Sequence, residues 1–62
     1  MSAEELIRLM ERHNLKDADV SRIVGATETS IRGWKEGRKH IPPAVERLLL
    51  IVLGESKPED YR

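Results

Sequence analysis

The side chains with the greatest capacity for chemistry lie in the middle of the chain, between Gly25 and His40. This segment has four Lys or Arg residues and two Glu residues, a net charge of +2, whereas the flanking segments are slightly acidic and the whole chain is neutral. Cationic side chains bind phosphate, and the planar fork of an arginine such as Arg32 also donates hydrogen bonds to the O6 and N7 atoms of guanine. The excess is modest and the whole chain is neutral, which argues against a histone-like or polybasic binder and leaves this segment as the one positively charged part of the chain.

Residue patterns for catalysis or metal binding are sparse. The chain has no cysteine, so a thiolate nucleophile, a thiolate zinc site and a disulfide are excluded. The two histidines, His13 and His40, have no second ligand at metal spacing, and there is no glycine-rich phosphate loop, H-E-x-x-H or Gly-x-Ser-x-Gly motif. We expect no enzyme activity, no metal site and no cofactor.

The length of 62 residues allows one small core. We expect one domain over residues 1–54 and a polar C-terminal tail over residues 55–62. The longest apolar run, Leu48 to Leu53, is six residues, far short of the roughly 18 needed for a membrane span. We therefore expect a soluble, cytoplasmic protein that does not contact membranes.

Two helices are predicted before the basic segment. Ser2 and Glu5 have the spacing of a capping box, which predicts a helix that ends near Asn14, a residue that tolerates the left-handed conformation. Asp17 is expected to cap a second, short helix, and Gly25 is expected to end it in a tight turn.

A third helix is predicted over residues 28–36. Thr27 has a side chain suited to cap it, and Gly37 follows its end. Ile31 and Trp34 are three residues apart, so both are expected to face the core, and the tryptophan is interpreted as a core residue. The residues expected on the exposed face of this helix are Glu28, Thr29, Arg32, Gly33 and Lys35.

A fourth helix is predicted from the Pro42 and Pro43 pair, which pre-sets the first turn, to about Leu53. Its apolar residues surround more than one face, which exceeds what a chain of this size can bury. We expect the surplus to form the interface of a homodimer. The residues expected in this interface are Leu49, Leu50, Val52 and Leu53.

The stretch VSRIVGATETSIRGWKEGRK, with its flanks from Leu15 to Ile41, resembles the Cro and lambda-repressor-like family, also called XRE-type helix-turn-helix domains. The positions that match the family pattern without a gap are Leu15, Gly25, Thr27, Ile31, Trp34 and Gly37. The resemblance implies a compact all-α domain of four to five helices around a central helix-turn-helix, whose second helix enters the major groove of DNA.

The resemblance also implies which side chains contact DNA. The expected base contacts are made by Glu28, Thr29, Ser30 and Arg32. The expected phosphate contacts are made by Lys16, Thr27, Lys35, Arg38, Lys39 and His40. Arg32 is the first choice for reading sequence, because a bidentate contact with guanine discriminates against a wrong base by roughly 1–3 kcal/mol.

The chain departs from the family pattern in two places. Many members have a Ser/Thr-Gln pair at the start of the second helix, where this chain has Lys16 and Asp17. Many members also pair an arginine of the first helix with a glutamate after the tryptophan, where this chain has Met10 and Lys35. Lys35 is therefore expected to reach either DNA or an acidic neighbour.

The resulting hypothesis is a homodimeric transcriptional repressor or autoregulator that binds a palindromic operator in double-stranded DNA. Phage regulators, antitoxins and small regulators beside anti-CRISPR genes are similar in kind, and the sequence does not choose among them. The alternative is a small helical module that binds a protein partner, such as a toxin, through the fourth helix. RNA binding is a weaker third reading, because exposed aromatic side chains for base stacking are lacking.

Overall fold

The computed structural model describes residues 1–55, which fold into four helices without a strand. The helices are α1 (Ala3–Arg12), α2 (Asp17–Val24), α3 (Glu28–Lys35) and α4 (Pro43–Val52). The all-helical class predicted from the sequence is therefore confirmed. The predicted tail falls largely on residues 56–62, which lie outside the described part of the chain.

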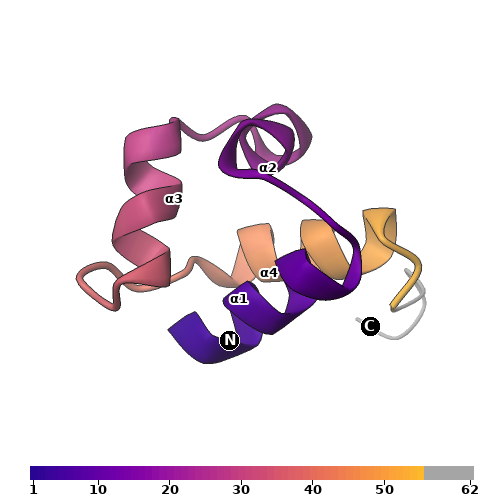
Figure 1. Cartoon of the computed structure of the whole chain (residues 1–62), viewed down its shortest axis with the longest axis horizontal. Helices are drawn as coiled ribbons and strands as arrows, with labels where there is room; N and C mark the ends of the chain where they lie inside the picture. Colours follow the sequence, from indigo (N-terminus) through magenta and orange to yellow (C-terminus); the bar gives the residue numbers. More distant parts are fainter. Residues whose placement is uncertain (56–62) are drawn as a thin grey trace.

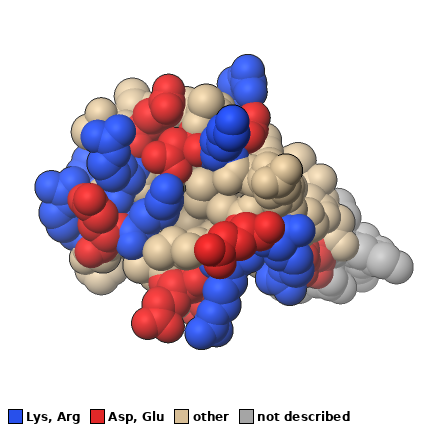
Figure 2. All heavy atoms as spheres, viewed as in Figure 1, with Lys and Arg blue, Asp and Glu red and all other residues tan. Residues whose placement is uncertain are grey.

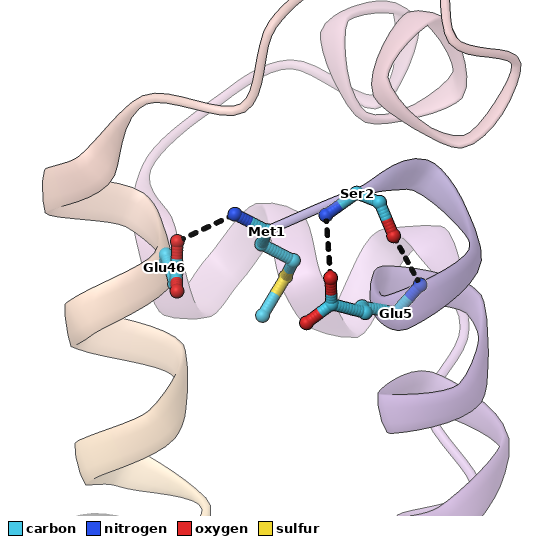
Figure 3. Close-up of polar contacts among 4 residues, drawn as sticks. All are labelled: Met1, Ser2, Glu5 and Glu46. Carbon is cyan, nitrogen blue, oxygen red and sulfur yellow. Dashed lines mark hydrogen bonds and ion pairs between the residues drawn. The ribbon is translucent and has the colours of Figure 1, made fainter.

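The helix ends follow local rules of the sequence. At the start of α1 the Ser2 hydroxyl accepts a hydrogen bond from the backbone N–H of Glu5, and the Glu5 carboxylate accepts one from the N–H of Ser2, both at 3.2 Å (Figure 3). This is the predicted capping box. Asn14, after α1, has a φ of 54°, and Gly25, after α2, has a φ of 74°, so both predicted stops are confirmed.

The predicted role of Asp17 as the cap of α2 is wrong. Lys16 is the N-cap residue, and Asp17 is the first residue inside the helix. The backbone N–H of Lys16 is bound instead by the carboxylate of Asp19, at 2.8 Å. Asp19 occupies the third helical position, from which an acidic side chain reaches back to the N-cap. The Asp17 carboxylate is thereby free for another partner.

The centre of the core takes one fully buried residue from each helix: Leu6, Val20, Ile31 and Leu49. Leu9, Met10 and Trp34 complete the buried set. Helix α2 packs against α3 and α4, and α1 packs against α3 (Figure 1). Full burial of an aliphatic side chain contributes about 1.5–3 kcal/mol, so these residues supply much of the fold's stability.

Ion pairs tie α4 to α1 near both of their ends. The α-amino group of Met1 lies 2.8 Å from Glu46 Oε1 (Figure 3), and this hydrogen bond raises the pKa of the amino group. Beyond the other end of α4, Glu55 Oε2 lies 2.8 Å from His13 Nε2 and 3.4 Å from Arg12 Nε. The two helices therefore run in the same direction (Figure 1).

The apolar surface of α4 differs from the predicted dimer interface. Leu49 is fully buried in the core, so it has no surface left for a second copy, and that part of the prediction is wrong. Leu50 and Leu53 are half-buried and pack against the same core. The large apolar side chains that α4 exposes are Leu48, at 38%, and Val52, at 54%.

Candidate nucleic-acid interface

A three-residue turn, Gly25 to Thr27, holds α3 at a steep inclination to α2: Figure 1 shows α2 nearly end-on and α3 from the side. Gly25 supplies the left-handed conformation, which costs roughly 1–2 kcal/mol in other residues. The Ser21 hydroxyl donates to the carbonyl of Ala26 at 2.6 Å. The Thr27 hydroxyl accepts from the N–H of Ser30 at 3.1 Å, so the predicted cap of α3 is confirmed.

The core fixes the rotation of α3 about its own axis. Ile31 is fully buried and Trp34 is 5% exposed, as the three-residue spacing predicted. Because successive residues on a helix are about 100° apart, the opposite face is turned to solvent. That face exposes Glu28, Thr29 and Arg32.

Ser30 differs from the other predicted base-contact residues. Its side chain is half-buried, and its Oγ accepts a hydrogen bond from the Thr27 hydroxyl at 3.1 Å. Both hydroxyls therefore belong to the first turn of α3. Thr27 itself is exposed at the tip of this turn.

The basic residues predicted for phosphate contact fall into two groups. Lys16, Lys39 and His40 are exposed, and neither lysine has a carboxylate within 4.0 Å among residues 1–55. The other two cations already have acidic partners. Lys35 Nζ lies 2.7 Å from Asp17 Oδ1, and Arg38 is paired with Glu36. Lys35 thus reaches an acidic neighbour, one of the two outcomes left open by the sequence.

Gly33 is not part of the exposed face, contrary to the prediction. It is buried, because the side chain of Lys39 lies across it: a Cβ atom at residue 33 would be 3.2 Å from Lys39 Cδ and 3.3 Å from Lys39 Cγ. The chain turns back over the helix here, since the N–H groups of Arg38 and Lys39 both donate to the carbonyl of Gly33. Lys39 is thereby brought alongside α3.

Charge around α3 is mixed rather than uniformly basic. Figure 2 shows Lys and Arg side chains gathered at the left edge of the molecule, over α3 and the loop that follows it, with acidic side chains between them. Arg32 is the cation of α3 that has no carboxylate within 4.0 Å in the described part of the chain. A surface of this kind offers few phosphate contacts and leaves one fork-shaped donor available.

Three residues of this region were missed by the sequence reasoning. Asp19 as a cap was detectable, because an acidic residue three positions after the N-cap is a known signal. The Ser21 hydroxyl bond and the Asp17 ion pair with Lys35 join positions that the sequence does not bring together. The first depends on the path of the turn after α2, and the second depends on how α2 packs against α3.

Residues 1–55 contain no group of three side chains arranged to hold a metal ion. Within the same residues, no helix has the length and apolar character needed to cross a membrane.

Comparison of the chain with models of protein families, with characterised proteins and with solved structures finds no match to any of them.

Proposed function

We propose that the chain is a sequence-specific DNA-binding transcriptional regulator in which α2, the turn and α3 act as a helix-turn-helix of the Cro and lambda-repressor-like kind. One observation carries the proposal: α3 is locked by the turn and by its buried face, while Arg32 extends from the opposite face without an acidic partner in the described residues. A rigid helix with a free guanidinium fork suits direct reading of the major groove.

Base reading is assigned to the exposed face of α3. Arg32 donates to the O6 and N7 of guanine, Glu28 accepts from the N4 amino group of cytosine, and Thr29 contacts a thymine methyl group. Ser30 has a smaller role in this proposal, because its hydroxyl is engaged with Thr27. Loss of the Arg32 contact is expected to cost roughly 1–3 kcal/mol at one base pair.

Phosphate contacts are assigned to the exposed groups at the edges of the two helices. Lys16 lies before α2, and Lys39 and His40 follow α3. The backbone amides at the start of α3, near Thr27, offer a further anion site. These contacts fix the register of the protein on DNA without reading sequence.

We further propose that two copies bind one operator, each reading a half-site about one helical turn from the other. The support for this is the exposed apolar pair Leu48 and Val52, one turn apart on α4. A dimer of this kind would repress transcription by occupying a promoter.

The experiment that tests the proposal is selection of bound duplexes from a random library near physiological salt. A palindromic consensus, preferred at least about 10³-fold over scrambled DNA, is the expected result. Arg32→Ala should abolish the preference at one base pair of each half-site. The matched control is Arg8→Ala, which removes the same charge from an exposed position of α1. Failure to enrich any sequence would refute the proposal.

A second candidate function rests on the same exposed pair of α4. Leu48 and Val52 suit a hydrophobic contact with a protein partner. The neutral net charge of the chain is also compatible with a partner that is a protein rather than a nucleic acid. The two functions are separated by the variants: a partner-binding module would lose its partner on Val52→Glu and would be indifferent to Arg32→Ala.

A further inference from the structure

The ion pair between Asp17 and Lys35 joins the start of α2 to the last turn of α3. The Lys35 Nζ and Asp17 Oδ1 atoms are 2.7 Å apart, and the two side chains are 32% and 22% exposed. The neighbouring pair of Arg22 with Asp19 is more open, at 78% and 34%. The Asp17 pair is thus partly shielded from solvent, so salt screens it less than it screens a fully exposed pair.

This ion pair affects how strongly Lys35 can bind a phosphate group of DNA. A cation increases affinity for DNA by displacing condensed counterions from a phosphate. This contribution is largest when the cation is not already paired with another anion. Lys35 already has a carboxylate at hydrogen-bonding distance. A phosphate that approaches Lys35 must also approach the negative charge of Asp17, which opposes it.

The base-reading face is not affected in the same way. Arg32 lies one turn before Lys35 on α3, and it is exposed without a carboxylate partner within 4.0 Å among residues 1–55. Asp17 therefore acts on a neighbouring cation while leaving the proposed reader of sequence free. Its effect should fall on the part of the binding energy that does not depend on base sequence.

We propose that Asp17 sets the strength and salt dependence of DNA binding by withholding Lys35 from the phosphate backbone. The proposal rests on the proposed function, since it concerns the same DNA-binding surface. Asp17 is a positioning residue here: it acts on DNA through Lys35. Removing its charge releases one phosphate-binding cation per subunit, and affinity should rise for every sequence by the same factor.

The test measures the affinity of the selected duplex and of a scrambled duplex across a salt series. Asp17→Asn should bind both duplexes more tightly, with their ratio unchanged, and its log–log salt slope should be steeper by about 0.9 per subunit. The steeper slope corresponds to an additional loss of affinity of roughly threefold per subunit when the salt concentration rises from 50 to 200 mM. In Asp17→Asn/Lys35→Gln, which lacks both charges, the slope should return to that of the unmodified protein.

The control variant is Glu4→Gln, which changes the net charge by the same amount on α1, where the Glu4 carboxylate pairs within its own helix. Its salt slope should stay unchanged. Asp17→Ser serves as a second neutral variant, and circular dichroism verifies that each variant is folded. Folded variants at residue 17 with the slope and affinity of the unmodified protein would overturn the role of Asp17. Absence of DNA binding by the unmodified protein would instead overturn the proposed function.

Discussion

At Gly33, the helix preference of a larger residue and the space left by Lys39 act in opposite directions. It occupies the interior of α3, where alanine is favoured over glycine by about 1 kcal/mol, yet a Cβ atom there would lie 3.2 Å from Lys39 Cδ. The obstructing atoms belong to an exposed lysine side chain, which can shift by a few tenths of an ångström. The helix preference should therefore outweigh the crowding.

We predict that Gly33→Ala raises the free energy of unfolding by up to about 1 kcal/mol, measured from urea unfolding curves. The gain should be larger in a Lys39→Ala background, because no side chain then has to move. A loss of stability in the single variant, with a gain in the Lys39→Ala background, would mean that Lys39 is held in place and cannot give way.

The position of a side chain could be predicted from the sequence only where it depends on its own helix. Spacing along one helix correctly placed Ile31 and Trp34 in the core, because helical periodicity is a local property. The same reasoning placed Gly33 on the surface, since only the turn after α3 brings Lys39 across it. Likewise, Asp17 and Lys35 are 18 residues apart, and their meeting depends on how α2 packs against α3.

At the scale of elements, two helix starts depend on a carboxylate that reaches back to the N-cap residue. Glu5 accepts from the N–H of Ser2, and Asp19 accepts from the N–H of Lys16. These hydrogen bonds favour the charged form, so they lower the pKa of each carboxyl group below its ordinary value of 4.5 for Glu5 and 3.8 for Asp19. Stability is therefore linked to pH at both helix starts.

A carboxyl group whose pKa is lower in the folded state stabilises the fold above its unfolded pKa, and this contribution is lost as pH falls through the folded pKa. We predict that the free energy of unfolding decreases as the pH is lowered from about 4.5. The double variant Glu5→Gln/Asp19→Asn should show a flatter dependence over the acid range in urea titrations. An equally steep curve for the double variant would assign the acid sensitivity to other groups.

Helix boundaries were largely predictable, because each is set by a few neighbouring residues. The stops at Asn14 and Gly25, and the cap at Thr27, were all identified from residue type and spacing. The apolar face of α4 was not, since six consecutive apolar residues give no helical phase from which to choose the buried side. Packing against α2 settled that phase, and it buried Leu49 while exposing Leu48 and Val52.

At the scale of the whole molecule, a core built from one fully buried residue per helix leaves apolar surface on α4 uncovered. Leu48 and Val52, together with the exposed Ala44, follow one another at four-residue spacing and form one stripe along the helix. A second copy related by a twofold axis would present the same stripe, so each would cover the other. The stripe runs along α4, whereas the proposed DNA-reading face belongs to α3.

We predict that the unmodified protein is a dimer whose thermal midpoint rises with protein concentration, and that Val52→Glu converts it into a folded monomer with a midpoint independent of concentration. Val52 is 54% exposed, so a charge at this position repels a second copy without entering the core. Sedimentation velocity over a concentration series measures the change. Ala18→Glu, which adds the same charge at an exposed position of α2, should leave the dimer intact. If the unmodified chain sediments as a monomer at every concentration, the apolar stripe of α4 is not an interface between copies, and an inverted-repeat operator would have to be read by monomers that bind independently.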